Sequence, residues 1–405
     1  MFNEIELSSV ITDIAAGPFG SNLKVSCFVP YGFPIIDGAN LKGFKVTDNL
    51  TKFVTEEKAR SLSRSIARRG DVIITISGTL GQIAYIPDDS MFEEYLCSQR
   101  QFRVSFDSSR VYVPYLVFYF HTNEGQGKIL SFANQTGVPA LSQPLKNFRK
   151  IRIQLPSYTE QRRIASVIEA INDKIECNQK VNDNLQQQAA AIFRSWFVDC
   201  DLFGGKAPDE WENVTLEDIT ALVSRGITPK YADDTDQIVI NQKCVRNHMI
   251  DLSLARTHTP KVINEKWLRF GDLLINSTGD GTLGRAAQVW FQPKNLTVDS
   301  HVTIVRPAKE NLIFYIGLWG ILHEKEIESL HTGSTGQTEL PRDRVKAMEL
   351  RLPDNDTLDR FNALITPMAA AIVANQEENN QLAALRDAIL PKLMSGEIDV
   401  SAVQL

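Results

Sequence analysis

The stretch 157–198 has the hydrophobic pattern of one long α-helix. Its apolar residues recur at alternating spacings of three and four, from Ile164 to Trp196, and therefore fall on one stripe of a helix. The stretch contains neither Gly nor Pro, and Ser157 with Glu160 makes a capping-box pattern at its start. Such a helix is about 60 Å long, more than one small domain covers. We therefore expect a partner helix.

The same pattern returns near the end of the chain, over 357–394. Sliding the chain along itself without a gap aligns Phe361 with Ile164 and Asn375 with Asn178. Internal repeats of this kind indicate a duplicated architecture. We predict that the two helices pair antiparallel and that Asn178 meets Asn375 at their shared midpoint, where a polar pair fixes the register of an apolar seam.

Two prolines lie within the second stretch and alter the expectation for it. Pro367 predicts a kink or a fresh helix start after Thr366, because proline in a helix interior costs about 3 kcal/mol. Pro391 predicts an early end, and Ser395-Gly396 predicts the stop of the helix.

The segments that precede the two long helices also resemble each other. Both contain short apolar or alternating runs bounded by turn signals, such as 72–76 and 101–106, which predict strands. Three motifs occur in both segments: Arg69-Gly70-Asp71 and Phe270-Gly271-Asp272, Gly78-Thr79-Leu80-Gly81 and Gly281-Thr282-Leu283-Gly284, and Thr136-Gly137 and Thr335-Gly336.

The predicted fold class is α+β, with two β-rich domains joined by two long antiparallel coiled-coil helices in a pseudo-two-fold internal repeat. A frame that occurs twice with different side chains suggests one scaffold that reads two different things. The predicted divisions are a first domain at 1–156, a long helix at 157–198, a linker with the second domain at 199–353, and a second helix with a C-terminal tail at 354–405.

Composition agrees with a protein of several units. The chain has 405 residues, too many for one ordinary core, and 43% of them are hydrophobic. A net charge of −6 argues against a generally basic nucleic-acid coat. The five cysteines are scattered without CxxC spacing, which is typical of reduced thiols, and the N-terminal residues lack the pattern of a signal peptide. We expect a cytoplasmic protein that does not span a membrane.

Catalytic signatures are missing from the sequence. It contains neither the phosphate-cradling GxxxxGK[ST] motif nor HExxH, and none of its six histidines falls at metal-ligand spacing beside cysteine. We therefore expect no catalytic residue, no bound metal and no cofactor. The pattern favours a binding protein over an enzyme.

Local basic runs and polar loops make nucleic acid the expected ligand. Lysine and arginine neutralise phosphates, whereas Asn, Arg, Lys and Ser on exposed loops read base edges, although each residue is as readily part of an ordinary solvated loop. The phosphate candidates at the domain–helix junctions are Lys146, Arg149, Arg342 and Arg344. The loop candidates are Ser21, Asn22, Lys24, Asn40, Lys42 and Lys45 in the first domain, and Arg225, Lys230, Tyr231, Asn241, Lys243 and Arg246 in the second.

Three aromatic residues, Phe193, Trp196 and Phe197, cluster at the end of the first helix. Clustered exposed aromatics usually mark a surface that binds a partner protein. We therefore assign these residues to partner binding, with burial against the second domain as the alternative reading.

Three segments carry a resemblance to a known family. EQRRIASVIEAINDKIECNQKVNDNL at 160–185 resembles the central conserved region of type I restriction-modification DNA specificity subunits, and LRDAILPKLMSGEIDV at 385–400 resembles their distal conserved region. GPFGSNLK at 17–24 is similar to their target-recognition domains. The resemblance implies a non-catalytic subunit whose two domains read a bipartite site in double-stranded DNA. It also implies docking of two methyltransferase subunits, which bind S-adenosylmethionine, and of restriction subunits that use ATP.

Two other function classes remain open on sequence alone. A fused methyltransferase or nuclease would bind S-adenosylmethionine or contain cofactor motifs, so a binding test on the isolated chain separates it. A structural coiled-coil protein would not shift DNA in a gel when a partner methyltransferase is present.

Overall fold

The computed structural model of the protein describes residues 3–134, 138–333 and 338–404. The chain divides into two compact units, of which the first comprises Met1–Ile175 with Asn380–Leu405 and the second comprises Glu176–Asn379. Each unit combines one β-rich domain with a part of both long helices. The repeated motifs Thr136-Gly137 and Thr335-Gly336 lie outside the described residues.

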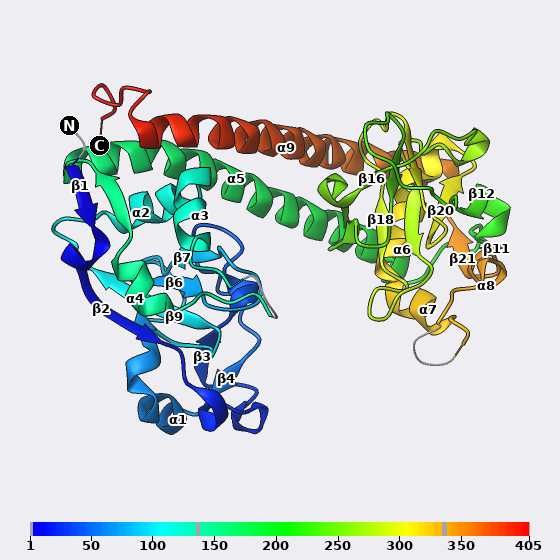
Figure 1. The fold of residues 1–405 in the computed structure, drawn as a ribbon. Helices are drawn as coiled ribbons and strands as arrows, with labels where there is room; N and C mark the ends of the chain where they lie inside the picture. The colour runs from blue at the N-terminus through cyan, green and yellow to red at the C-terminus, as the bar shows by residue number, and fades with distance from the viewer. Residues whose placement is uncertain (1–2, 135–137, 334–337, 405) are drawn as a thin grey trace. The chain divides into compact units, whose positions relative to one another are not determined.

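Two four-stranded sheets form the β-rich domain of the first unit (Figure 1). The antiparallel sheet has the order β2 (Ile11–Ala16), β9 (Gln101–Phe106), β6 (Val72–Thr75) and β7 (Ile83–Tyr85). The second sheet has the order β4 (Phe53–Val54), β3 (Phe33–Ile36), β8 (Glu94–Cys97) and β5 (Ile66–Arg68), with β3 and β8 parallel. β1 (Asn3–Glu6) pairs with β10 (Arg152–Leu155), so the two ends of the domain lie together.

Apolar runs explain why the core of the first unit forms where it does. All four residues of β6 are buried, and the strands predicted over 72–76 and 101–106 are confirmed as β6 and β9. The helices of this domain are α1 (Glu56–Ser61), α2 (Val113–Phe120), α3 (Asn123–Leu130) and α4 (Pro144–Arg149). Six of the eight residues of α2 are buried in the same hydrophobic cluster as β6 and β9.

The second unit repeats this arrangement. One sheet has the order β12 (Thr220–Arg225), β20 (Val302–Pro307), β17 (Leu273–Asn276) and β18 (Ala286–Gln288). Another has the order β16 (Arg256–Thr257), β13 (Ile238–Ile240) and β19 (Leu296–Val298). Two further pairs are β11 (Glu212–Thr215) with β21 (Glu349–Leu352), and β14 (Val245–Arg246) with β15 (Met249–Ile250). The helices are α6 (Ile313–Leu322), α7 (Glu324–Ser329) and α8 (Arg342–Lys346).

Sheet order and register confirm the internal repeat. β2-β9-β6-β7 corresponds to β12-β20-β17-β18, and the parallel pair β3–β8 corresponds to β13–β19. Val72 lies opposite Val104 in the first unit, as Leu273 lies opposite Val305 in the second. Equivalent residues of the two units can therefore be assigned from strand pairing as well as from sequence.

The repeated Gly-Asp motif forms a tight turn before β6 and before β17. Gly70 (φ 83°) and Gly271 (φ 89°) adopt the left-handed conformation that glycine tolerates best. The carboxylates of Asp71 and Asp272 each accept the backbone N–H three residues earlier, at 2.9 Å in the first unit and 2.8 Å in the second. The motif occurs twice because this turn requires both residues.

The first long helix is α5 (Tyr158–Phe193), which continues as a π-helical turn, η6 (Arg194–Val198). The helix predicted over 157–198 is thus confirmed, and the Ser157 hydroxyl accepts the N–H of Glu160 at 3.3 Å. The second is α9 (Asn355–Ser395). The Asp354 carboxylate caps it by accepting the N–H of Thr357 at 2.9 Å.

The prolines of α9 do not interrupt it, so the predicted restart at Pro367 and early end at Pro391 are wrong. Pro367 is exposed, and so is Ala363, whose carbonyl loses its helical partner. Water can satisfy that carbonyl on the exposed face, while the buried face of the helix remains packed. The predicted stop is confirmed, since Gly396 (φ 77°) follows the last helical residue.

Within the second unit, α5 and α9 run antiparallel, and polar side chains fix their register. Asn178 donates to the side-chain oxygen of Asn379 at 2.9 Å, and Asn375 donates to that of Asn182 at 2.8 Å. The two hydrogen bonds are equivalent in the internal repeat, because Asn375 corresponds to Asn178 and Asn379 corresponds to Asn182. The predicted contact between Asn178 and Asn375 is wrong by one helical turn. Each of these asparagines bonds instead to an asparagine that lies one turn further along the other helix.

Candidate nucleic-acid interface

Three loops of the first unit meet at one edge of its antiparallel sheet. β2 and β6 end there and β9 begins there, since both strands are antiparallel to β9. The loops are 17–24, 76–82 and 98–100, and we call them the first loop edge. By the same pairing, the second loop edge comprises residues 226–231, 277–284 and 299–301 of the second unit.

Glycine begins the first loop of each edge for a steric reason. A Cβ on Gly17 would lie 1.8 Å from the carbonyl oxygen of Ser98, and a Cβ on Gly226 would lie 1.9 Å from that of Val298. The close approach lets Gly17 donate to the carbonyl of Gln101 at 2.8 Å. Both loops therefore require glycine at the point where they leave the sheet.

Ser21, Asn22 and Lys24 are exposed on the first loop edge, as an interface with nucleic acid requires. The side chain of Gln99 holds this loop by donating to the carbonyls of Gly20 at 2.6 Å and Leu23 at 2.9 Å. The same edge carries Arg100, which is exposed and was not among the candidates from sequence. An arginine directly before an alternating strand was the available signal.

The candidates after β3 divide into three kinds. Asn40 is buried, and its amide donates to the carbonyls of Thr47 and Asn49 at 3.2 Å, so the expectation of an exposed loop residue is wrong. Lys42 is exposed. Lys45 forms an ion pair with Asp173 of α5 at 3.1 Å, which ties the loop to the helix.

The basic candidates beside the first helix lie on α4. Lys146 is exposed there and Arg149 is half-buried. Their counterparts Arg342 and Arg344 lie on α8 and are exposed, and Arg344 donates to the carbonyl of Leu330 at 3.1 Å. α4 and α8 precede β10 and β21 respectively, so the structure places these four residues on equivalent elements, outside the two loop edges as defined.

Polar side chains at and beside the second loop edge are bonded within the chain. Arg225, at the end of β12, is half-buried rather than exposed on a loop, and it donates to the carboxylate of Glu339 and to the carbonyl of Leu340. Thr278 lies 2.8 Å from Nδ1 of His301 and donates to Gln242 at 3.2 Å. Sequence reasoning missed His301, which occupies the position equivalent to Arg100.

The remaining candidates of the second unit lie in two groups. Lys230 and Tyr231 are exposed on the second loop edge, with the Arg256 guanidinium 3.6 Å from the centre of the Tyr231 ring. The other group follows β13: Lys243 and Arg246 are exposed, whereas the Asn241 side chain donates to the carbonyl of Leu254 at 3.0 Å.

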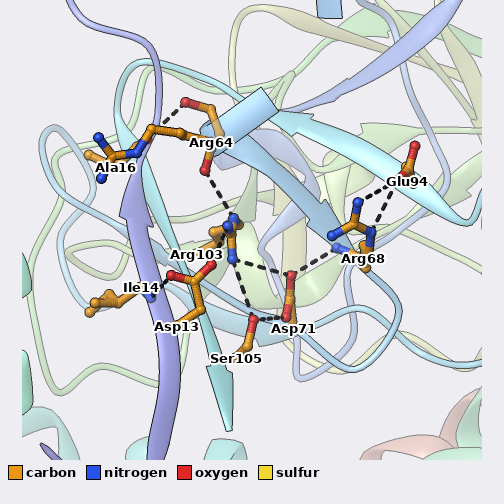
Figure 2. A network of polar contacts seen from close by, with 10 residues as sticks. Asp13, Ile14, Ala16, Arg64, Arg68, Asp71, Glu94, Arg103 and Ser105 are labelled. Carbon is orange, nitrogen blue, oxygen red and sulfur yellow. Dashed lines mark hydrogen bonds and ion pairs between the residues drawn. The ribbon is translucent and has the colours of Figure 1, made fainter. Parts of the chain in front are cut away.

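A polar network in the first unit ties β2, β6 and β9 together below the loop edge (Figure 2). Arg103 donates to Asp13 at 2.6 Å and lies 4.0 Å from Asp71, to which Ser105 donates at 2.5 Å. The hydrogen bond from Arg103 holds the pKa of Asp13 below its usual value, whereas burial raises the pKa of Asp71. The network fixes the strands from which the loops emerge.

The aromatic residues predicted to bind a partner pack inside the second unit instead. Phe193 is buried, and Trp196 and Phe197 are half-buried in the same hydrophobic cluster. The rings of Phe197 and Phe361 lie 4.8 Å apart, and those of Phe193 and Tyr315 lie 5.5 Å apart. The expectation of an exposed cluster is therefore wrong, because these rings pack against Phe361 of α9 and Tyr315 of α6.

Among residues 3–134, 138–333 and 338–404, no group of three His, Cys, Asp or Glu side chains is arranged to hold a metal ion. No described helix is long and apolar enough to cross a membrane.

The family model and two curated relatives that match the sequence all belong to type I restriction specificity proteins. Residues 29–187 match the family model of the type I restriction modification DNA specificity domain. The MjaIX specificity subunit, a type I restriction enzyme component from Methanocaldococcus jannaschii, is 24% identical and covers 86% of this chain and 82% of its own. The type I HindI specificity subunit from Haemophilus influenzae is 20% identical, over 83% of this chain and 88% of its own.

The fold agrees with a solved structure. The S subunit of a type I restriction-modification system from M. genitalium matches with a TM-score of 0.58 and 12% identity, over 97% of this chain and 96% of that chain. The predicted fold class, β-rich domains combined with long helices, is thereby confirmed. Taken together, the family model over residues 29–187 and the curated relatives make the chain similar in sequence to type I restriction-modification specificity subunits, and the solved structure shows that it shares their fold.

Proposed function

We propose that the chain is the DNA sequence-specificity subunit of a type I restriction-modification complex, and that each unit reads one half of a bipartite target. The observation that carries the proposal is the duplicated frame: both units present loops at the same sheet edge, with glycine at the same place and different side chains beyond it. Two loop edges that share a backbone frame but carry different side chains can each bind a different base sequence.

Within each unit, the loop edge reads bases and nearby cations position the duplex. Ser21, Asn22 and Lys24 in the first unit, and Lys230 and Tyr231 in the second, are exposed polar residues on these edges. Lys146 and Arg342 contact phosphates in this proposal. Phosphate contacts make affinity depend on salt without specifying sequence, whereas base contacts specify sequence.

We further propose that the chain itself performs no catalytic step. Two methyltransferase subunits supply S-adenosylmethionine and methyl transfer, and restriction subunits supply ATP-driven cleavage. The test is equilibrium binding of S-adenosylmethionine to the isolated chain, compared with the chain bound to its methyltransferase. No binding to the isolated chain is expected, and stoichiometric binding to it would overturn this part of the proposal.

The main experiment is sequencing of modified bases in a host that expresses the chain with its methyltransferase partner. The expected result is one motif with two specified halves separated by unspecified positions. A single continuous motif, or methylation without sequence preference, would contradict reading by two units.

A further inference from the structure

Arg100 and His301 occupy the same place in the two units. The carbonyl of Arg100 accepts the N–H of Ile76 at 2.6 Å, and the carbonyl of His301 accepts the N–H of Ser277 at 2.8 Å. The next residue in each unit accepts the N–H of the edge glycine, Gly17 or Gly226. The backbone therefore delivers both side chains to the loop edges along the same path, while the side chains differ in chemistry.

The Arg100 side chain is exposed, and no hydrogen bond or ion pair joins it to another of the described residues. By contrast, Arg60 and Arg68 of the same unit both bond to Glu94. Nη1 of Arg100 lies 3.7 Å from where a Cβ on Gly78 would be, so the guanidinium lies over the loop that follows β6. Its planar fork of donors matches O6 and N7 of guanine in the major groove.

His301 is held differently. Thr278 Oγ1 lies 2.8 Å from Nδ1 of His301 and 3.2 Å from the side-chain oxygen of Gln242, so Nδ1 is engaged within the chain. His301 is exposed, which leaves Nε2 as the ring nitrogen available to a ligand. A ring nitrogen can donate to or accept from a base edge in the major groove.

We propose that Arg100 and His301 are specificity-determining residues of the two units. Arg100 donates to a guanine in one half-site, and Nε2 of His301 forms a hydrogen bond with a base edge in the other. The inference rests on the proposed function and assigns one base position in each half to a single side chain.

The test uses the full chain co-expressed with its methyltransferase and sequencing of the modified bases. Arg100→Ala is expected to lower discrimination by roughly 10- to 100-fold at one position of one half-site, with the other half unchanged. Arg100→Lys keeps the charge without the fork and is expected to lose much of the same discrimination. His301→Ala is expected to relax one position in the other half only.

Arg269→Ala is the matched control, because Arg269 is exposed at the opposite end of β17 from the loop edge. Unfolding midpoints equal to wild type confirm that each variant is folded. An unchanged motif in Arg100→Ala and His301→Ala would overturn the inference, as would an equal loss of methylation at every site. Either result leaves the proposed function intact, whereas a wild-type chain without a bipartite motif would refute the proposed function itself.

Discussion

The two units retain the same buried carboxylate but neutralise it from different places. Asp272 is paired with Arg306 through two hydrogen bonds of 2.8 and 2.7 Å, and both residues are buried. In the first unit, strand register places Ser105 where Arg306 lies in the second, and Ser105 donates to Asp71 instead. The arginine comes from Arg103, two residues earlier on the same strand.

This difference shows which parts of the fold are fixed. The aspartate is needed by its own backbone, since it accepts the N–H that closes the turn before the strand. The positive charge only has to reach the carboxylate, so it can come from either of two positions on the neighbouring strand. The loop edges follow the same rule: the backbone contacts of Gly17 and Gly226 repeat, whereas the side chains of Arg100 and His301 differ.

The largest expected effect is in the second unit. Arg306→Met leaves Asp272 buried without its partner and is expected to lower the free energy of unfolding by about 3–5 kcal/mol. Urea unfolding followed by tryptophan fluorescence measures this unit, because all five tryptophans of the chain lie in it. Arg103→Met is the matched control in the first unit.

Arg103→Met is expected to cost less, about 1.5–3 kcal/mol. Asp71 keeps its bond from Ser105, and Asp13 is largely exposed, with 59% of its side chain accessible. Hydrogen exchange of α2 peptides at increasing urea measures this unit. An equal loss of unfolding free energy in the two variants would contradict this prediction. It would mean that the buried pair of Asp272 and Arg306 and the partly exposed network around Arg103 stabilise their units equally.

The ends of the long helices provide a second comparison. The repeat places Leu393 at the end of α9 where Trp196 lies at the end of α5, and Leu393 is buried whereas Trp196 is half-buried. Leu393→Ala is expected to destabilise the first unit by about 2–5 kcal/mol. Trp196→Ala is expected to cost less than the 3–5 kcal/mol or so of a fully buried tryptophan. A larger loss for Trp196→Ala would mean that the ring is more enclosed than its exposure indicates.

The asparagine bonds between α5 and α9 give a smaller contrast. Asn375→Ala removes the donor to the buried Asn182 and is expected to cost about 1–3 kcal/mol. Asn379→Ala is expected to cost about 0.5–1.5 kcal/mol, because Asn178 still donates to Glu378 at 2.8 Å. Unfolding midpoints of the two alanine variants test this order, and a reversed order would contradict it.

These residues also show how far sequence alone can lead. The spacing of apolar residues predicted both long helices and their duplication, because that signal is local and extends over many turns. Their register depends on which asparagines face each other after packing, which the midpoint of a sequence pattern does not give. Pro367 was read as a break because its exposure was unknown.

The candidate site was predicted less well than the fold. Ser21, Asn22 and Lys24 are exposed as expected, but Asn40 is buried, since turn residues can bond inward as readily as they face solvent. Arg100 and His301 were missed because their equivalence appears only once strand register is known. Phe193 was assigned to a partner surface because the sequence does not show that α6 and the start of α9 cover it.

The smallest expected effect is a difference in pH dependence. Burial lowers the pKa of His121 in the first unit, so its contribution to stability is present above the ordinary value of about 6.5 and is lost as pH falls below it. The hydrogen bond that His248 donates to the Glu324 carboxylate raises the pKa of His248 in the second unit, so its contribution is present below that value and is lost as pH rises through the raised pKa.

A fall in pH below the ordinary histidine pKa of about 6.5 should therefore weaken the first unit through His121. A rise in pH above that pKa should weaken the second unit through His248. His248→Gln is expected to flatten the pH dependence of the second unit above its ordinary pKa, and His121→Gln that of the first unit below it. Urea unfolding of each variant across this pH range is the measurement. A slope of the same sign in both units would contradict the assignment.

The central claim is that each unit reads DNA on its own, and exchange of one domain tests it most directly. Residues 1–156 would be replaced by the corresponding domain of a relative with a different target, and the modified bases sequenced in a host carrying the methyltransferase partner. The account predicts that one half of the motif changes to that of the relative and the other half stays. A chimera that methylates the original motif, or one in which both halves change, would contradict it.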